Sequence, residues 1–443
     1  MTEQENVLPL LARALQRIRL TPPRIISSPP TQPRRAAVAL LIRVVPAPNT
    51  PLPPTQEKPL DLDKFFTQEW VNHPNATPEI LFLHRETPTP ATSDGSLWQS
   101  QKKANEAHIA FPGGRQEPDD EGGLYTAMRQ TWEEIGIDLA EPCYTCVGQL
   151  DDREITTSLG KRLLMILSPF VFLQLTPSAP PADPVETTIL HWTPLQELVS
   201  QHKPPIWSTV TVDAASRLAS KHSAVLRLLV RVFIGSMQFP AIVFRDFGVK
   251  PTDEKRESRQ PSKVLKLWGL SLGMTLDLMS YMILQPPPPI SRNSSSTHVP
   301  SAVASAGNGN VNGSAQPDYF ARPSSASPTP STPLSEVMQL PYLDGQDFRM
   351  EYVAPSLASV FPRFSYPDVN FWIWVFGKRY REVIRGWEAS VRGGSANDRR
   401  INWSGTALST FYASIRKALV VVIVARALGV IFGVSFALWW IFS

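Results

Sequence analysis

The chain has 443 residues, of which 42% are hydrophobic, enough apolar material for one large domain with extensions or for two domains. The net charge of +4 is small for this length and argues against a dedicated nucleic-acid-binding protein. Two cysteines, Cys143 and Cys146, exclude a disulfide framework and favour a reducing compartment. Many of the 44 prolines are clustered, which indicates disordered segments between globular ones.

The N-terminal segment lacks the pattern of a secretory signal, because Glu3 and Glu5 interrupt the basic region that such a signal requires. Residues 8–20 (LPLLARALQRIRL) are amphipathic and basic. They suit a surface helix of the domain better than an organelle presequence, since acidic residues precede them and are rare in presequences. We treat residues 1–35 as an N-terminal extension.

Short apolar runs follow and predict strands that alternate with helices. Residues 36–45 and 80–83 are continuous apolar runs typical of buried strands. Residues 86–107, which follow the second run, are polar and predict a surface loop. Further strands are expected at 144–150, 163–173 and 239–244, a short helix starting at 192–195, and a long apolar helix at 264–282. This order predicts an α/β fold.

Beyond residue 284 the composition changes twice. Residues 285–335 are mostly Pro, Ser, Ala, Gly and Asn, and they predict a disordered linker because they have too few apolar side chains to form a core. Residues 336–417 form a membrane-proximal region. It includes 371–376 (FWIWVF) with a basic flank, a segment that suits either an interfacial membrane helix or a core strand.

The C-terminal segment 418–443 predicts a transmembrane tail anchor. Residues 418–442 are apolar all round, and a span needs about 20 apolar residues. Arg426 interrupts the run toward its N-terminal side, where a long side chain reaches the headgroups. The alternative is a buried terminal helix. An anchor of this kind would place the preceding domain on the cytosolic side of a membrane, with the mitochondrial, peroxisomal and endoplasmic reticulum membranes all left open.

The most informative segment is 111–137 (FPGGRQEPDDEGGLYTAMRQTWEEIGI), which predicts a glycine turn, a helix and a glycine stop at Gly136. Its acidic side chains gather before and on one face of the helix, where positions 130, 133 and 134 are neighbours. Clustered carboxylates repel one another and need a cation. Hard oxygen ligands select Mg²⁺ or Mn²⁺, and such an ion can bind a diphosphate and activate water.

This segment resembles the Nudix box, whose pattern is G-x5-E-x7-R-E-U-x-E-E-x-G-U with U apolar. The matching positions are Arg129, Glu133, Glu134, Gly136 and Ile137. Gln130 stands where the family has its first Glu of the R-E pair, and it offers a carbonyl oxygen without charge or basicity. One extra residue between Gly114 and Arg129 leaves either Asp120 or Glu121 as the leading acid.

The flanking sequence is similar to the coenzyme A diphosphatase branch of that family. The similar features, in order, are the strand ending at Arg85, Phe-Pro-Gly-Gly at 111–114, Gly-Gln-Leu-Asp-Asp at 148–152, Glu186 before Trp-Thr-Pro-Leu at 192–195, Phe239-Pro240 and Trp268-Gly269. The Arg, His and Gly that this branch carries before Phe111 are not in place. NADH, ADP-ribose and dinucleotides therefore stay open beside coenzyme A and acyl-coenzyme A.

The resemblance implies an α/β/α Nudix sandwich with a mixed sheet over residues 36–284, acting on a small nucleoside-diphosphate derivative with Mg²⁺ or Mn²⁺. It implies metal ligands among Gly114, Asp120, Glu121, Gln130, Glu133 and Glu134. Arg129 would orient the carboxylates, and Glu186 would act as the base in place of Gln130. Substrate contacts are expected from Arg85, Gly113, Gly114 and Arg115. A domain that binds such a ligand at a membrane without cleaving it is the alternative from another class.

Overall fold

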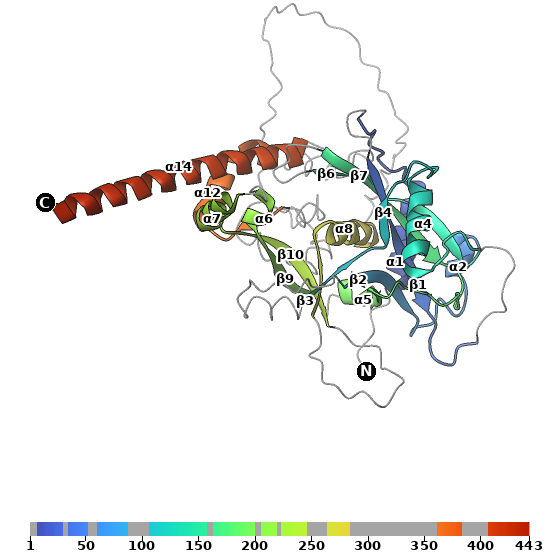
Figure 1. Cartoon of the computed structure of the whole chain (residues 1–443). Coiled ribbons are helices and arrows are strands. Elements are labelled where there is room, and N and C mark those ends of the chain that lie inside the picture. Colours follow the sequence, from blue (N-terminus) through green and yellow to red (C-terminus); the bar gives the residue numbers. More distant parts are fainter. Residues whose placement is uncertain are drawn as a thin grey trace, which may run out of the picture.

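A computed structural model of the chain (Figure 1) describes residues 7–29, 34–51, 60–86, 106–156, 163–199, 205–218, 223–245, 264–283, 361–382 and 406–442. The predicted linker at 285–335 and most of the predicted loop at 86–107 lie outside these residues. The helices are α1 (Leu8–Leu20), α2 (Leu62–Phe66), α4 (Gly123–Ile135), α5 (Gln196–Val199), α6 (Ala214–Leu218), α7 (Ala224–Phe233), α8 (Gly269–Ile283), α12 (Pro367–Phe376) and α14 (Thr406–Phe442). The strands are β1 (Arg35–Val45), β2 (Thr77–Arg85), β3 (Glu106–Ala110), β4 (Gly113–Arg115), β5 (Tyr144–Gln149), β6 (Arg153–Thr156), β7 (Leu163–Gln174), β8 (Thr188–Pro194), β9 (Ile206–Asp213), β10 (Ser236–Arg245), β11 (Val264–Trp268) and β12 (Arg363–Phe364).

The described strands form one mixed sheet. Along its main path the order is β12-β10-β11-β3-β2-β1-β7-β5, while β4 pairs with β1, β6 with β7, β8 with β2, and β9 with β10. The pairs β1–β7 and β3–β11 are parallel, and the other pairs are antiparallel. The predicted mixed α/β sheet is thus confirmed.

Strand β1 explains why its sequence is apolar without alternation. Its residues Leu40 and Ile42 point into a core shared with α1 and α8, while Ala39 and Leu41 point into a core shared with α4. All four side chains are fully buried. A strand covered by helices on both faces has no polar side, so an unbroken apolar run is what its position requires.

The two faces of the sheet are covered by different helices, which gives the predicted three-layer arrangement. Helix α1 buries Leu11, Leu15 and Ile18, and its Arg17 Nη1 donates a hydrogen bond of 3.1 Å to the Tyr281 carbonyl of α8. Helix α4 covers the opposite face and buries Ala127 and Ile135. Residues 8–20 therefore form a helix that packs on the domain, in line with the preferred interpretation of that segment. The domain boundaries themselves stay predictions.

Two predicted elements near the middle of the chain are wrong in their details. Residues 264–282 were predicted as one helix, but the structure divides them into β11 and α8 at Gly269, whose φ of +62° is the left-handed conformation that glycine adopts most easily. Residues 192–194 end strand β8 instead of starting a helix, because they pair with β2 as far as Glu79–Pro194. The short helix α5 begins at Gln196.

A second core lies toward the C-terminal end of the molecule. It is formed by Ala214, Ile234, Met237, Phe364, Val369, Phe411, Ile415, Leu419 and Val422. These residues come from or directly adjoin α6, α7, β10, β12, α12 and the first half of α14. Segment 371–376, for which an interfacial helix or a core strand was expected, is the helical end of α12.

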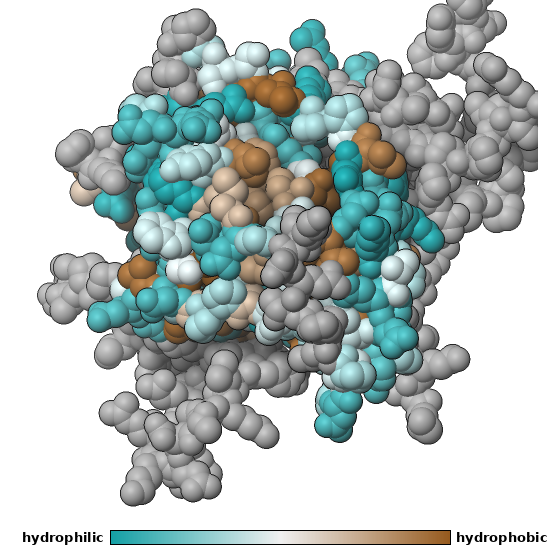
Figure 2. Space-filling view, turned by 90° about the vertical axis from the view of Figure 1, so that its right-hand side faces the viewer, coloured by the Kyte–Doolittle hydropathy of each residue, from teal (hydrophilic) through white to brown (hydrophobic). Residues whose placement is uncertain are grey.

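Helix α14 leaves the body of the molecule and ends far from it (Figure 1). Its stretch Ser409–Phe442 has a mean hydropathy of 2.5, and it is an apolar helix long enough to cross a membrane. Its first half packs on the second core, whereas every described residue from Ala427 to Phe442 is exposed. We call Ala427–Phe442 the tip of α14. The opposite side of the molecule, which carries α4, is largely hydrophilic with scattered apolar patches (Figure 2).

Arg426 marks the point where the tip begins. Its guanidinium forms two hydrogen bonds to Asp368 of α12, at 2.8 and 2.6 Å, and a third of 2.6 Å to the Phe233 carbonyl at the end of α7. It also lies over the Tyr366 ring, 4.3 Å from its centre. The one charge inside the apolar run is therefore paired with the body of the protein.

Candidate active site

Helix α4 presents one apolar face to the sheet and one charged face outward. The side chains of Thr126, Ala127, Thr131 and Ile135 are buried at helical spacing. The helix ends at Gly136, where φ is +67° and an added side chain would meet the backbone of Asp183 at 3.0 Å. The outward face carries Arg129, Gln130, Glu133 and Glu134. The sequence therefore positions these four side chains by burying the other face of the same helix.

Asp120 and Arg129 form the most enclosed ion pair of the site. Arg129 Nε and Nη2 donate to the two Asp120 oxygens at 2.7 and 2.8 Å, and the Asp120 side chain is 2% exposed. The same carboxylate accepts from the Glu117 amide and the Thr126 hydroxyl, each at 2.9 Å. The Arg129 hydrogen bond, aided by the Glu117 amide and Thr126, holds the pKa of Asp120 well below its usual range.

These contacts occupy both Asp120 oxygens and give the residue a structural task. Asp120 fixes the turn that precedes α4 and fixes the direction of the Arg129 side chain. The prediction that Asp120 or Glu121 ligates a metal stays a prediction. Glu121 is exposed and Asp120 is not, so only Glu121 is open to solvent in this arrangement.

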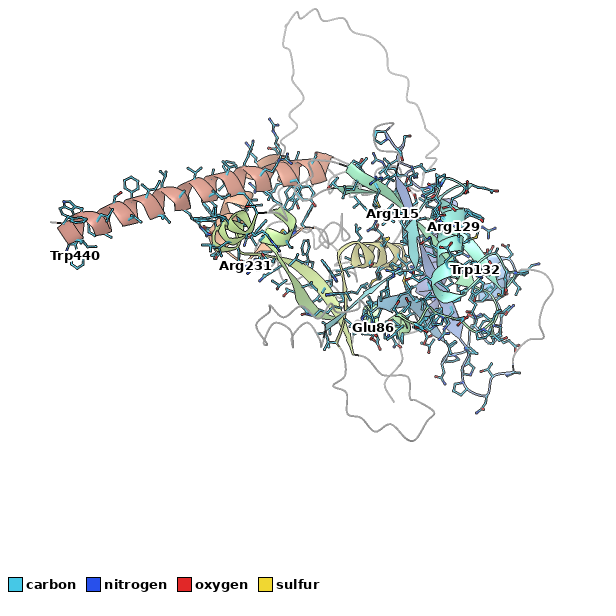
Figure 3. The ribbon with its side chains drawn as sticks, in the orientation of Figure 1. Glu86, Arg115, Arg129, Trp132, Arg231 and Trp440 are labelled. Carbon is cyan, nitrogen blue, oxygen red and sulfur yellow. The ribbon has the colours of Figure 1, made fainter. Side chains whose placement is uncertain are left out.

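Arg129 continues from Asp120 to the outward face of the helix. Its Nη1 donates to both Glu133 oxygens, at 2.9 and 3.1 Å, and to Glu117 at 3.3 Å, while Nη2 donates to the Arg115 carbonyl at 3.3 Å. The expected pairing of Arg129 with Glu133 is present. Figure 3 shows Arg115, Arg129 and the exposed Trp132 along the same side of the molecule.

Arg85, at the end of β2, is paired with Glu134. Its Nη2 donates to Glu134 Oε2 at 2.7 Å, its Nε contacts the other oxygen, and Nη2 also reaches the Phe111 carbonyl at 3.5 Å. The Arg85 side chain is 43% exposed, so a ligand can reach it from solvent. Arg85 thus bridges the end of α4 and the start of the Phe-Pro-Gly-Gly segment.

The glycine turn lies directly beside Gln130. Gly113 has a φ of +146° and packs on the β1 backbone at Ala37 and Val38, and a side chain at Gly114 would overlap with the Gln130 amide. Gln130 Nε2 donates to Glu133 Oε2 at 3.0 Å. A glutamate at this position would repel Glu133 instead of donating to it. Without a cation, the amide is the more compatible partner.

Glu186 lies in the turn that directly precedes β8. This turn contacts the end of α4 and the end of β2. The amide of the preceding residue, Val185, donates to the Glu134 carbonyl at 3.1 Å, and the following Thr187 accepts from the Glu86 amide at 2.7 Å. Glu186 itself is exposed. The backbone thereby brings Glu186 to the same edge as Glu134 and Arg85, although it lies 52 residues after Glu134 and 101 residues after Arg85 in the sequence.

Two residues of this network were not singled out from the sequence. Glu117 and Thr126 hold the Asp120–Arg129 pair from either side. Both lie close to Asp120 in sequence, three residues before it and six after it, and this nearness is the signal that could have identified them.

The donors around the glycine turn suit one hard divalent cation. Mg²⁺ is commonly held by one or two carboxylates together with water and substrate phosphates. Of the predicted ligands, Gln130 lies between the Glu133 carboxylate and Gly114, whose backbone pairs with Ala37 of β1. Among the described residues no three His, Cys, Asp or Glu side chains are arranged as a metal site. The oxygen donors present are thus one or two carboxylates and an amide, and their role as metal ligands stays a prediction.

Comparison with known proteins defines the class of this domain. Residues 78–210 match the family model of the NUDIX domain. An uncharacterised protein of Schizosaccharomyces pombe is 28% identical over 224 residues, which cover 50% of this chain and 58% of that protein. The chain therefore spans little more than half the length of this curated relative.

Two solved structures with weaker similarity carry the same family name. One is the Nudix hydrolase RenU from M. smegmatis, at 14% identity and a TM-score of 0.21, covering 37% of this chain and 72% of that one. The other is a MutT/nudix family protein from Enterococcus faecalis, at 10% identity and a TM-score of 0.19, covering 46% and 51%. The family-model match, not these structures, shows that this chain contains a Nudix domain.

Proposed function

We propose that the chain is a metal-dependent hydrolase that cleaves the diphosphate linkage of a nucleoside-diphosphate derivative. The observation that carries this proposal is the gathering of Arg85, Gln130, Glu133 and Glu134 around residues 111–114, within a Nudix domain. Carboxylates beside arginines and a glycine turn suit a substrate that carries several negative charges and arrives with a cation.

Glu133, Glu134, the Gln130 amide oxygen and the Gly114 carbonyl would hold Mg²⁺ or Mn²⁺. When bound, such an ion neutralises diphosphate charge and lowers the pKa of a water molecule. Arg85 is partly exposed and already points its planar guanidinium toward this site, and this group binds phosphate oxygens in pairs. We assign Arg85 and Arg115 to the substrate phosphates, and the Gly113–Gly114 turn to close approach of the substrate.

The proton of the attacking water needs an acceptor other than Gln130, because an amide has no useful basicity. Glu186 is an exposed carboxylate at the same edge as Glu134. In our proposal its oxygen takes the proton while the water oxygen bonds to phosphorus and the bridging P–O bond breaks. Two phosphate monoesters are the products. Arg129 acts as a positioning residue, since it contacts Glu133 and is fixed by Asp120.

The substrate we propose first is coenzyme A or an acyl-coenzyme A, and this rests on the similarity of the flanking motifs alone. Cleavage of its diphosphate would give a phosphopantetheine and adenosine 3′,5′-bisphosphate. NADH, ADP-ribose and dinucleotides contain the same linkage and form the second group of candidates. We further propose that α14 anchors the chain in a membrane, with the Nudix domain on the cytosolic side.

A module that binds without cleaving is the second candidate, favoured by one specific observation. Glu133 and Glu134 are each paired with an arginine, and Gln130 donates a hydrogen bond to Glu133. The charges of this face are thus balanced by the protein itself. Such a face binds an anionic ligand through Arg85 and Arg115 without needing a cation for its own stability.

One experiment separates these candidates. The full chain in detergent is incubated with Mg²⁺ or Mn²⁺ and with coenzyme A, acyl-coenzyme A, NADH, ADP-ribose and diadenosine polyphosphates, and the products are separated by chromatography. We expect metal-dependent cleavage that is lost with a chelator and in Glu134→Gln. Saturable binding of a panel member without any cleavage, with or without metal, would replace the hydrolase with the binding module.

A further inference from the structure

Helix α7 carries an apolar stripe that faces away from the protein. Val225, Leu228, Leu229 and Val232 are 69%, 62%, 45% and 55% exposed. Their spacing places them on one face of the helix, whereas Arg227 lies toward the opposite face, and Arg231 at the edge of the stripe pairs with Asp213 at 2.6 Å. A stripe of this kind in water exposes contiguous apolar surface, which marks a site of interaction.

Helix α12 carries a second stripe of the same character. Phe371, Trp374 and Val375 are 56%, 50% and 37% exposed, again at the spacing of one helical face. The next residues, Lys378 and Arg379, are exposed cations. Aromatic side chains followed by basic ones are typical of helices that lie at the boundary between headgroups and acyl chains.

Both stripes lie beside the base of the α14 tip. Arg426 joins the end of α7, through the Phe233 carbonyl, to the first turn of α12, through Asp368. Figure 1 shows α7 and α12 packed below α14 where it leaves the body, and Figure 3 shows Arg231 of α7 on that side and Trp440 at the far end of the tip. The two stripes are therefore carried by the two helices to which Arg426 joins the base of the tip.

Arg426 fixes where the tip begins. Its guanidinium is bound to Asp368 of α12 and to the Phe233 carbonyl at the end of α7, so the tip starts beside the two helices that carry the stripes. Amphipathic helices at a membrane surface lie with their apolar face about 5–10 Å deep in the headgroup boundary. Apolar stripes at the base of a membrane helix suit that position.

We propose that the exposed stripes of α7 and α12 insert into the interfacial layer of the same bilayer that takes the tip of α14. The body is then seated on the membrane by three helices instead of being tethered by one. Lys378 and Arg379 face anionic headgroups beside the inserted stripe of α12. The proposal requires α14 to be a membrane helix, and it does not depend on whether the Nudix domain cleaves its ligand.

The test uses the full chain in vesicles of phosphatidylcholine with phosphatidylserine that carry a traceable phospholipid. The photoreactive residue benzoylphenylalanine is placed singly at Leu228, Phe371, Val434 and Ile25, and irradiated. Val434 reports on the tip, and Ile25 is a matched exposed apolar position outside these helices, 67% exposed. We expect attachment of lipid at Leu228 and Phe371 as strong as at Val434, and none above background at Ile25.

Each other outcome overturns the proposal. Lipid attachment at Val434 without attachment at Leu228 and Phe371 would show a tethered body with both stripes in water. Crosslinking of one chain to another at Leu228 or Phe371 would show that a second copy covers the stripes. No lipid attachment at Val434 would show that the tip does not enter the bilayer, and the seating proposed here fails with it.

Discussion

The outward face of α4 and the tip of α14 are both exposed helical surfaces, but their side chains are satisfied in opposite ways. On α4 the carboxylates of Glu133 and Glu134 are paired with arginines of the same domain. Beyond Arg426, the tip of α14 has no charged side chain to pair. A charged face balanced in this way is stable in water, and in our proposal it binds an ionic ligand by exchanging these partners. The apolar tip gains stability only by leaving water.

The largest effect that we expect concerns the site on the charged outward face of α4. Glu186→Gln should lower kcat about 100-fold, because the attacking water loses its proton acceptor. KM should change little, since Arg85 and Arg115, which we propose to bind the phosphates, remain. Steady-state kinetics on the best substrate of the panel measure both values. Glu86→Gln, an exposed acid across the same backbone contact, is the control, and an equal loss in both variants would remove Glu186 from the proposed role.

A substitution at Gln130, on the same face of α4, should increase activity. Gln130→Glu should raise kcat about tenfold to a hundredfold at saturating Mg²⁺, because it supplies a carboxylate at the glycine turn. Gln130→Leu, which lacks both charge and oxygen, should give no gain. The measurement is single-turnover cleavage across a range of Mg²⁺ concentrations. If all three forms bind ligand and none cleaves it, the binding module is the better description.

The buried pair of Asp120 and Arg129 should contribute more to the stability of the fold than to the hydrolysis reaction. Asp120→Asn should lower the free energy of unfolding by about 3 kcal/mol at pH 7, because Arg129 loses the most buried of its three carboxylate partners. Urea denaturation of the full chain in detergent measures the change. Asp119→Asn, an exposed neighbour, is the control, and a similar change in both variants would contradict the assignment.

The sign of the pH dependence follows from the pKa of Asp120. Arg129 lowers this pKa in the folded protein relative to the unfolded value of about 3.9. The stability that the pair contributes is therefore fully present above that unfolded value and is lost as the pH falls toward the folded pKa. The difference between wild type and Asp120→Asn should thus be smaller at about pH 3 than at pH 7.

The smallest effect that we expect concerns the ion pair at the base of the apolar tip of α14. Arg426→Ala should lower the free energy of unfolding by about 1 kcal/mol, because the Arg426–Asp368 pair is partly exposed and water screens it. Thermal unfolding of the full chain in detergent detects this change. Arg379→Ala removes an exposed cation of the same region and should leave stability unchanged. A loss well above that estimate would mean that the pair holds α7, α12 and α14 together more strongly than its exposure suggests.

Local patterns were sufficient for much of the fold. The apolar runs at 36–45 and 80–83 predict β1 and β2 because both faces of these strands are buried. The turn-helix-turn at 111–137 was predicted at nearly its observed bounds, because Gly136 ends α4 in a conformation that other residues avoid. The change from strand to helix at Gly269 was missed, since apolar composition alone does not distinguish a buried strand from a buried helix.

The pairings within the site were harder to predict because they join distant segments. The role of Arg85 at substrate phosphates stays a prediction, and its pairing with Glu134, 49 residues away, was not predicted. Arg426 was expected to reach lipid headgroups, but it pairs with Asp368, 58 residues away. No periodicity reports such contacts. The sequence does indicate why such pairs form. A single charge in an apolar or acidic segment needs a partner.

The parallel pairing of β1 with β7 has a consequence for the order of folding. It joins Arg35 to Ile166, so a loop of about 130 residues must close before β1 gains β7 as its neighbour. Contacts so distant in sequence form slowly, whereas the antiparallel neighbours β5, β6 and β7 meet across short connections. Because β4 pairs with β1, the glycine turn of the site should reach its final position only after β1 has docked, among the last steps of folding.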